Sequence, residues 1–321
     1  MGAVFKDYKA FIREDVPEIY AVPETIDGEA VTCIGERAFY GCKGLKQVIL
    51  PKTVTAIGDY AFAECRQLHK FVFPEIAASV GDYAFYNCMA LKEIVLGKNI
   101  SAIGYGAFKN CLELDKVTMD IAPGRKNCLN SILQDEFQEV DVTLNYMDDG
   151  GNVGDVAHLV FTDYQYEYVP EIEARQFNWE TYGSGDSYRI SIRDTDIDYE
   201  KYDSVFSLAQ VEDDENTLLK IVAGRLCWPH KLSDESRERY EAYVKAHMRK
   251  ILEQIIGGNG PEAGERLFDY LLKRRLLTPE DVDFALDLCS RISRASMTAQ
   301  LMDYQGAKKP KAGGIRSRFA L

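Results

Sequence analysis

Three aspartates at alternate positions, Asp194, Asp196 and Asp198, have the spacing with which a calcium-binding loop begins. Such a loop also needs a glycine at its sixth position and a bidentate glutamate at its twelfth. This chain has Tyr199 and Val205 at those positions, so it lacks the residues that shape the turn and complete the coordination. We expect a solvated acidic linker here, and no calcium.

Other residues that often act in catalysis or bind metals do not form a recognisable motif in this sequence. The four histidines, at positions 69, 158, 230 and 247, do not have the spacing of an HExxH helix or of another metal site. The segment Gly183-Ser184-Gly185 lacks the strand-to-helix context of a nucleophile elbow and the lysine of a phosphate-binding loop. We therefore predict no metal, no cofactor and no catalytic residues, and we predict that the chain is not an enzyme.

The strongest pattern is a nine-residue phrase that recurs at intervals of 23 residues. Its four copies are Ile34–Cys42, Ile57–Cys65, Val80–Cys88 and Ile103–Cys111. Each copy is followed by a phrase of the form L-x-x-V-x-L, which begins at Leu45, Leu68, Leu91 and Leu114. A fixed period of this length predicts a solenoid, because one unit cannot bury its apolar face alone and must stack on its neighbours.

The second phrase predicts a short strand. Val48 and Leu50 lie two residues apart and share the inward face, whereas Gln47 and Ile49 share the outward face. Successive coils should bring the equivalent segments together as parallel strands centred on Val48, Phe71, Ile94 and Val117. The first phrase should add an inward stack made by Phe39, Phe62, Phe85 and Phe108. Glycines at 35, 58, 81 and 104 indicate a tight turn with little room for a Cβ atom.

The same period places half of the eight cysteines in a ladder: Cys42, Cys65, Cys88 and Cys111. Their Cβ atoms should lie one coil apart, at the roughly 4.8 Å that separates neighbouring strands. That separation exceeds the Cβ–Cβ distance of about 3.8 Å that a disulfide requires. We predict a ladder of buried, reduced thiols.

These repeats resemble leucine-rich repeats of the BspA-like class, whose signature is I-G-x-x-A-F-x-x-C followed by L-x-x-V-x-L-P. The resemblance covers about residues 18–120. Pro51 and Pro74 supply the terminal proline, and Gly97 and Asp120 depart from it. It implies an α/β repeat in the form of a leucine-rich-repeat solenoid, from a bacterial family whose members are often exported to the cell surface. Residues 128–129 and 140–144 form either a degenerate last coil or a cap.

Beyond residue 139 the period is lost, and we expect a mixed α+β domain that ends in a helical bundle. The predicted organisation is a solenoid with caps over 1–139, a β-rich connecting segment over 140–200, a helical bundle over 201–305 and a disordered basic tail over 306–321. Strands are expected over 140–145, 158–169 and 189–193. Tyrosines at 164, 166 and 168 form a stripe on one sheet face, which either packs on a neighbouring element or binds a ligand.

Helical periodicity begins near Tyr202 in this second half. We expect one helix from Ser233 to Gly257, another over 261–277 and a further helix that starts at Thr278. Residues 223–229 and 299–304 resemble a C-terminal region of some bacterial leucine-rich-repeat proteins of unknown function. That resemblance implies no chemistry.

Charge and hydropathy limit the partners. The net charge is −13, which argues against nucleic acid as the main partner. The chain has no stretch of about 18 apolar residues, so we predict no membrane-spanning helix. Its start lacks the apolar run of a signal peptide. We expect a cytoplasmic protein, with the cell surface as the alternative if a signal peptide has been removed.

The outward face of the repeat strands is the candidate binding surface. Two ladders make it up: Gln47, Lys70, Glu93 and Lys116, and beside them Ile49, Val72, Val95 and Thr118. An apolar row flanked by mixed charges suits a protein or peptide better than a glycan. The alternative is that β-branched residues at these positions only favour strand formation.

The sequence therefore predicts a non-catalytic protein-interaction or scaffold protein that uses the strand face. Three alternatives stay open. Residues 140–305 form an enzyme or sensor that the repeats target, the chain is a cell-surface adhesin, or the repeats serve as a rigid spacer or dimer interface. The partner's identity and the oligomeric state are also left open.

Overall fold

A computed structural model describes residues 2–5, 17–134, 136–170 and 177–306. The chain falls into two compact units, Met1–Ser233 and Asp234–Leu321. This division lies inside the segment that the sequence assigned to one helical bundle. Which of the segments 1–139, 140–200 and 201–305 folds by itself stays a prediction. The tail over 307–321 lies outside the described residues.

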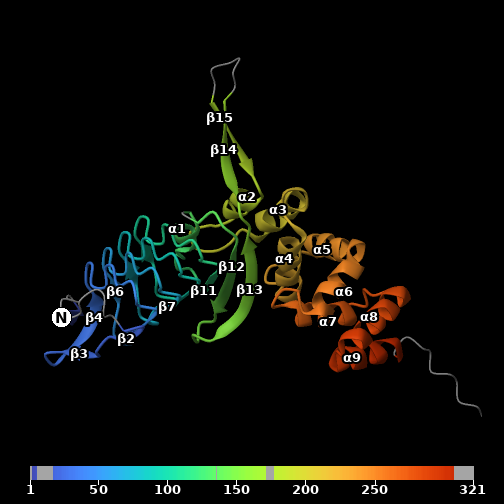
Figure 1. Ribbon diagram of the computed structural model, residues 1–321, viewed down its shortest axis with the longest axis horizontal. Coiled ribbons are helices and arrows are strands. Elements are labelled where there is room, and N and C mark those ends of the chain that lie inside the picture. Colours follow the sequence, from blue (N-terminus) through green and yellow to red (C-terminus); the bar gives the residue numbers. More distant parts are fainter. Residues whose placement is uncertain (1, 6–16, 135, 171–176, 307–321) are drawn as a thin grey trace, which may run out of the picture. The chain divides into compact units, whose positions relative to one another are not determined.

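A solenoid occupies the N-terminal part of the first unit (Figure 1). The four predicted strands pair in parallel, which confirms the expectation drawn from the 23-residue period. They are β5 (Gln47–Ile49), β7 (Lys70–Val72), β9 (Glu93–Leu96) and β11 (Lys116–Ile121). The sheet continues to β2 (Ile19–Ala21) at one edge and to β12 (Val140–Met147) and β13 (Val153–Phe161) at the other.

A second sheet, which the sequence did not predict, lines another side of each coil. Its parallel strands are β1 (Ala3–Phe5), β4 (Glu29–Ile34), β6 (Ala56–Ile57), β8 (Ser79–Val80) and β10 (Ala102–Ile103). A short strand, β3 (Thr25–Ile26), pairs antiparallel with β4. Three of the five parallel strands are only two residues long. Runs this short carry no alternation from which a strand could be recognised.

The predicted phenylalanine ladder is buried inside the coils. Successive ring centroids are 4.9 Å apart for Phe39 and Phe62, 5.3 Å for Phe62 and Phe85, and 5.2 Å for Phe85 and Phe108. The ring planes are within 7° of parallel. Phe5 adds one more ring, 5.4 Å from Phe39. The aromatic stack therefore begins before the first complete copy of the sequence phrase.

The repeated glycines are required by close packing between coils. A Cβ atom on Gly58, Gly81 or Gly104 would lie 2.7 Å or less from backbone of the preceding coil. Left-handed backbone occurs elsewhere in the coil, at Tyr60 and Tyr83, both with φ of 54°. The glycines thus mark the tight approach that the sequence predicted, and not a left-handed turn.

The cysteine ladder is reduced and buried, as predicted. Three of its four thiols donate a hydrogen bond to a phenylalanine carbonyl of the coil before them. The Sγ–O distances are 3.1 Å from Cys65 to Phe39, 3.2 Å from Cys88 to Phe62 and 3.4 Å from Cys111 to Phe85. Burial raises the pKa of the Cys88 thiol far above its usual range, so the ladder stays protonated and unreactive.

Residues 128–147 form a degenerate last coil, one of the two possibilities that the sequence left open. Here α1 (Leu129–Leu133) precedes β12, which pairs in parallel with β11. The next strand, β13, turns back and pairs antiparallel with β12. The Tyr202 hydroxyl then bonds to the outer backbone of β13, accepting from Val160 N at 2.9 Å and donating to Val160 O at 2.8 Å.

Two of the predicted strands differ from the structure. The run 158–169 is divided between β13 and β14 (Gln165–Pro170), with a break at 162–164. Residues 189–193 contain the end of α2 (Gly185–Arg189) and a turn, with a single bridge from Ile192 to Ile197. The reason is Arg189, whose buried guanidinium donates to five backbone carbonyls: those of Leu133, Glu136, Gln138, Thr162 and Gly185. A strand residue with an outward side chain could not make these contacts.

Helices complete both units. The first unit has α3 (Tyr199–Glu212) and α4 (Glu215–Cys227). The second has α5 (Asp234–Ala246), α6 (Met248–Gly257), α7 (Gly264–Lys273), α8 (Pro279–Ile292) and α9 (Ala295–Gly306). The single helix predicted from Ser233 to Gly257 is interrupted at His247. The predicted start of α8 is confirmed by a capping box between Thr278 and Asp281. No described helix combines the length and the apolar character that crossing a bilayer requires.

Candidate binding surface

The eight residues of the candidate surface share one face of the sheet. The register pairs Gln47 with Lys70, Lys70 with Glu93, and Glu93 with Lys116. Beside this row, Val72 pairs with Val95, and Val95 with Thr118. Ile49 and Val72 are 51% and 50% exposed, whereas Val95 and Thr118 are half-buried. The two-residue alternation therefore assigned the inward and outward positions correctly.

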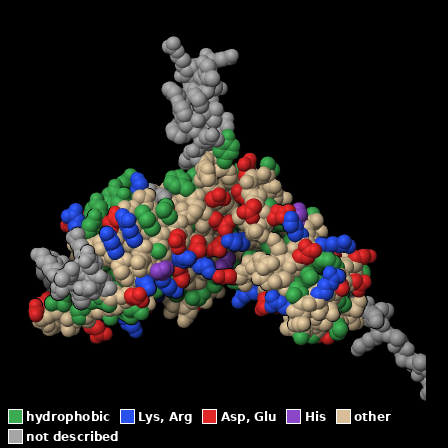
Figure 2. Space-filling view, viewed as in Figure 1, with side chains coloured by type: hydrophobic (Ala, Val, Ile, Leu, Met, Phe, Trp, Pro, Cys, Tyr) green, Lys and Arg blue, Asp and Glu red, His purple; other side chains and the backbone are tan. Residues whose placement is uncertain are grey.

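Charges along the first row alternate in sign. Lys70 Nζ lies 2.8 Å from Glu93 Oε1, and the next residue is Lys116, which pairs in register with Asp141 of β12. Both partners of the Lys70–Glu93 pair are partly exposed, so the pair contributes at most about 1 kcal/mol to folding. Figure 2 shows acidic and basic side chains interspersed over the visible face of the solenoid. The surface therefore offers charges of both signs around its apolar row.

Helix α4 covers the C-terminal end of this face. Lys220 of α4 lies 4.0 Å from Asp141 Oδ2 and forms an ion pair with Glu139. A Cβ atom on Gly224 would lie 2.6 Å from the His158 carbonyl, so the helix touches β13 directly. Burial raises the pKa of the Asp141 carboxyl to about 6, even though Lys220 and Lys116 lower it. The open part of the face thus lies over β5, β7 and β9.

Sequence reasoning missed the continuation of the second row. Thr118 pairs with Thr143 of β12, which pairs in turn with His158 of β13. Thr143 Oγ1 lies 3.1 Å from His158 Nδ1, and the His158 ring lies 3.8 Å from the Trp228 ring. The alternation over residues 140–144 was the available signal, but nothing local links His158 to Trp228. The second row therefore runs from the exposed Ile49 to His158, whose ring packs against Trp228.

The opposite end of the face is also longer than predicted. Ile19 and Ala21 of β2 pair with Gln47 and Ile49 and extend both rows by one strand. Ile19 is 58% exposed, slightly more than Ile49 or Val72. Three exposed β-branched residues consequently lie on neighbouring strands of one sheet.

The acidic run at 194–198 is not a solvated linker, contrary to the sequence expectation. Asp196 is half-buried and accepts a hydrogen bond from the Tyr146 hydroxyl at 2.7 Å. Asp198 caps α3 by accepting from Lys201 N. Within the described residues, no group of three or more His, Cys, Asp or Glu side chains could hold a metal ion. The run therefore serves to attach α3 to the end of the solenoid.

One histidine does lie beside a carboxylate. His230 Nδ1 is 2.5 Å from Asp155 Oδ2, and the imidazole stacks on Tyr146 with centroids 3.9 Å apart. The other ring nitrogen, Nε2, is buried and has no hydrogen-bond partner among the described residues. The pair thus lacks the nucleophile with which a histidine–carboxylate pair acts in a triad. Its evident role is to fix the loop after α4 against β12.

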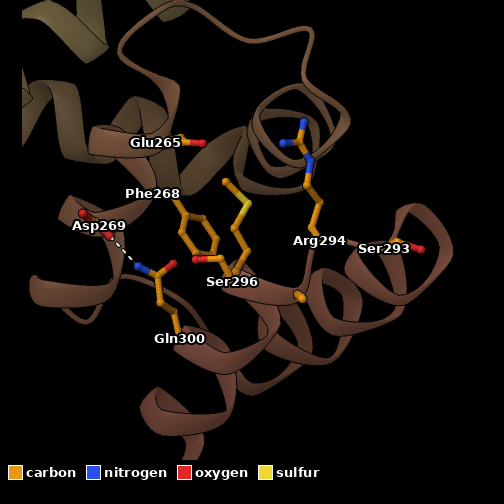
Figure 3. Close-up of a pocket in the computed structure, with 9 residues that line it drawn as sticks. Glu265, Phe268, Asp269, Ser293, Arg294, Ser296 and Gln300 are labelled. Carbon is orange, nitrogen blue, oxygen red and sulfur yellow. Dashed lines mark hydrogen bonds between the residues drawn. The ribbon is translucent and has the colours of Figure 1, made fainter.

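A small pocket lies within the second unit, between α7 and the α8–α9 turn (Figure 3). Its volume is about 250 Å³, and Phe268 and Met297 provide its apolar lining. Three of the polar side chains around it bond within the protein: Gln300 donates to Asp269 at 3.0 Å, and Arg294 Nε donates to the Ile256 carbonyl at 3.0 Å. Ligand pockets are typically ~300–1,000 Å³ and have polar groups that converge on the ligand. This pocket does not compete with the strand face as a candidate site.

A larger hollow of about 570 Å³ in the first unit lies beside α4 and is lined mainly by polar side chains. Glu139 accepts from both Thr217 and Lys220, and Asp214 caps α4 by accepting from Asn216 N and Thr217 N. These groups satisfy one another and hold α4 in place. The hollow adds no set of convergent free groups.

Residues 24–140 match the family model described as "BspA type Leucine rich repeat region", in six copies. A leucine-rich repeat protein from Bacteroides capillosus ATCC 29799 is 30% identical over 32% of this chain and 77% of that one, with a TM-score of 0.30. The chain belongs to the BspA-type leucine-rich-repeat family. The match extends to the start of β12, in agreement with the degenerate last coil.

Two further solved leucine-rich repeat proteins are similar to part of this chain. A leucine-rich repeat protein from Bacteroides ovatus ATCC 8483 is 32% identical over 28% of this chain and 24% of that chain, with a TM-score of 0.28. The T. pallidum leucine-rich repeat protein is 27% identical over 38% of this chain and 68% of that one, with a TM-score of 0.32. The BspA-type chain therefore spans about a quarter of the B. ovatus protein. No curated protein matches this chain.

Proposed function

We propose that the protein is a non-catalytic interaction module whose contact surface is the open strand face over β5, β7 and β9. The observation that carries this proposal is the half exposure of Ile49 and Val72 on adjacent strands, next to the Lys70–Glu93 ion pair. Protein interfaces typically combine an apolar centre with a polar rim, and this face has both. A binding role also agrees with the repeat family to which the chain belongs.

The core beneath the face makes it rigid. Val48, Phe71 and Ile94 point inward from the same three strands and are 5% exposed or less. Phe71 packs edge-on against both Phe62 and Phe85, at 5.0 and 4.6 Å between centroids. A surface fixed in this way loses little conformational freedom when a partner binds, so more of the contact energy appears as affinity.

The area of the strand face is smaller than that of a standard protein–protein interface. Five strands from β2 to β11, spaced by roughly 4.8 Å, give a width of roughly 20 Å. With strands of three to six residues, the open area is well below the ~800 Å² that each partner buries in a standard interface. We therefore favour a peptide segment as the partner, or a protein that also contacts the turns of the coils.

The test compares two aspartate substitutions within one coil. Val72→Asp places a charge at the centre of the face, and Ile76→Asp places the same charge on a residue that is 45% exposed but lies outside the strands. Affinity capture with the whole chain should recover the same partner with wild type and Ile76→Asp, and lose it with Val72→Asp. The loss is expected because a charge desolvated without a partner in an interface is costly.

Circular dichroism and thermal melting of both variants serve as the folding control. Equal recovery of the partner by the two variants would show that the strand face is not the contact surface. Loss of the partner with Ile76→Asp alone would move the binding site to the turns.

A further inference from the structure

Charge is distributed unevenly over the open strand face. Strands β5 and β7, together with the residue that precedes each of them, carry Lys46, His69 and Lys70 and no acidic residue. The side chains of Lys46 and Lys70 are 42% and 48% exposed, and His69 is exposed as well. His69 N donates to the Lys46 carbonyl at 3.1 Å, so the three residues lie on adjacent coils. We call them the basic spot.

The glutamates that pair with the basic spot belong to other strands. Lys46 Nζ lies 2.6 Å from Oε1 of Glu18, which precedes β2, and Lys70 Nζ lies 2.8 Å from Oε1 of Glu93 in β9. Ion pairs at exposed sites are weak, so a carboxylate of a partner can replace either glutamate at little cost. The His69 side chain makes no hydrogen bond or ion pair with the described residues. It therefore offers a donor for which no carboxylate of this chain competes.

The two most exposed apolar residues of β5 and β7 lie beside the basic spot. Ile49 and Val72 are 51% and 50% exposed. Val72 follows Lys70 by two residues and shares its face of the sheet, which places the two side chains roughly 7 Å apart along the strand. The same two strands thus present an aliphatic pair next to a group of basic side chains.

We propose that the segment bound by the strand face is an acidic–aliphatic peptide. Its aliphatic side chain packs on Ile49 and Val72, and an aspartate or glutamate within about two residues of it pairs with the basic spot. The inference rests on the proposed function, because it names the partner of the same surface. An apolar centre with a charged rim is the usual composition of a protein contact.

Charge complementarity decides between an acidic and a basic peptide. A lysine or arginine next to the aliphatic side chain would meet Lys46 and Lys70 and would be repelled. The net charge of the whole chain is −13, but exposed charges more than about 8 Å away are largely screened at physiological ionic strength. The residues that can lie on this part of the face are therefore set by the basic spot.

A peptide also fits better than a long polyanion. Nucleic acids and sulfated polysaccharides gain affinity from many charge contacts along their length. Here the basic residues are confined to two strands and are flanked by Glu18 and Glu93. A polyanion would meet these glutamates and would leave Ile49 and Val72 uncovered.

The tyrosine stripe expected from the sequence supplies no second site in its described part. Tyr164 is buried, with its ring centroid 5.2 Å from that of Phe137 and the Arg189 guanidinium 4.8 Å from the ring. It thus packs on neighbouring elements, which is one of the two roles that the sequence left open. The side chains of Tyr166 and Tyr168 lie outside the described part of β14, which pairs with β15 (Phe177–Tyr182).

The experiment starts with a phage-displayed library of random peptides, selected on the immobilised full chain. Peptides of about 12 residues are long enough, because about six extended residues cross the roughly 20 Å of the face. The enriched sequences should contain Asp or Glu within two residues of Ile, Leu or Val. A synthetic copy of one enriched peptide then serves as the probe in fluorescence anisotropy.

Two matched charge reversals test the contact. Lys70→Glu changes the basic spot, and Lys109→Glu makes the same change at an exposed turn residue outside the strands. Lys70→Glu should weaken binding of the peptide about tenfold or more, and Lys109→Glu less than about twofold. Replacing the peptide's acidic residue by its amide should weaken binding to wild type about tenfold and have little further effect on Lys70→Glu, as expected for two groups in contact.

A second variant guards against misfolding. His69→Gln keeps the Lys70–Glu93 ion pair and should weaken the peptide about threefold, while the circular dichroism stays unchanged. Equal binding by Lys70→Glu and Lys109→Glu would overturn the inference.

The same selection separates this inference from the proposed function. Enriched peptides that lack acidic residues but lose binding to Val72→Asp would overturn the inference and leave the proposed function standing. No enrichment, or peptides that bind Val72→Asp as tightly as wild type, would overturn both. Heparin binding at physiological salt that Lys70→Glu abolishes, without enrichment of acidic peptides, would assign the basic spot to a polyanion and also overturn the inference.

Discussion

Individual side chains in the solenoid carry large and unequal shares of its stability. Phe62 is fully buried and has a parallel ring on each side, at 4.9 and 5.3 Å, and the edge of Phe71 at 5.0 Å. Ile76 on the same coil is nearly half exposed. Because a coil contacts only its neighbours, an empty ring position leaves a cavity that other parts of the chain cannot fill.

Phe62→Ala should therefore lower the free energy of unfolding by about 3–5 kcal/mol, the typical cost of removing a buried phenylalanine. Ile76→Ala is the control and should change it by less than about 1 kcal/mol. Urea titration followed by circular dichroism measures both. Equal midpoints for the two variants would contradict the buried ladder.

Asp141 should make stability depend on pH. Its carboxyl has a pKa of about 6 in the folded chain, raised by burial from an ordinary value of 3.8. The folded state binds the proton more tightly than the unfolded state, so stability falls as pH rises from about 4 to about 6. Asp141→Asn should remove this contribution, and its urea midpoint relative to wild type should rise between pH 4.5 and pH 7. A difference between the two proteins that is independent of pH would refute the shift.

At the scale of elements, the end of the solenoid is completed by a tyrosine hydroxyl. Tyr202 of α3 bonds to both backbone groups of Val160 that point away from β12. The neighbouring Tyr188, 4.6 Å away between ring centroids, is equally buried, but its hydroxyl has no hydrogen-bond partner in the described part of the chain. Of these two buried tyrosines, the hydroxyl of Tyr202 is therefore fully hydrogen-bonded and that of Tyr188 is not.

Tyr202→Phe should destabilise the protein by about 2 kcal/mol or more, because it leaves a buried N–H and a buried carbonyl without partners. Tyr188→Phe removes an unpaired hydroxyl and should be neutral or slightly stabilising. Hydrogen exchange should show a faster Val160 amide in the first variant only. Equal destabilisation by both changes would mean that packing, and not hydrogen bonding, decides this contact.

The elements that could be predicted from sequence are those with a repeated signal. The strands at Val48, Phe71, Ile94 and Val117 recur in phase, and so their outward residues could be assigned from the two-residue alternation alone. The strand proposed at 189–193 was wrong because local alternation does not reveal that Arg189 reaches carbonyls from distant segments. The covering of the strand face by α4 likewise depends on contacts between residues about 80 positions apart, such as Glu139 and Lys220. No local pattern encodes such a pairing.

At the scale of the whole molecule, the two compact units have separate cores. Leu267 of α7 is fully buried in the second unit, and Phe62 is fully buried in the first. Compact units with cores of their own are expected to unfold as separate cooperative units.

Calorimetry should therefore show two transitions. Leu267→Ala should lower the temperature of one transition, and Phe62→Ala should lower that of the other, since each creates a cavity in one core only. A single transition that moves with both substitutions would show that the two units are coupled.

Because β13 turns back antiparallel to β12, no further coil can be added to the solenoid at its C-terminal end. Repeat proteins lengthen by duplication of whole coils, and a new coil must find an unpaired strand edge on each side that it joins. At the β13 end that edge is occupied by Tyr202 and α4. Additional 23-residue coils could enter between existing ones, where the phenylalanine, cysteine and glycine ladders would accept them in phase. Such an insertion would widen the strand face by about 4.8 Å per coil. The β13 edge, which Tyr202 and α4 cover, would stay unchanged.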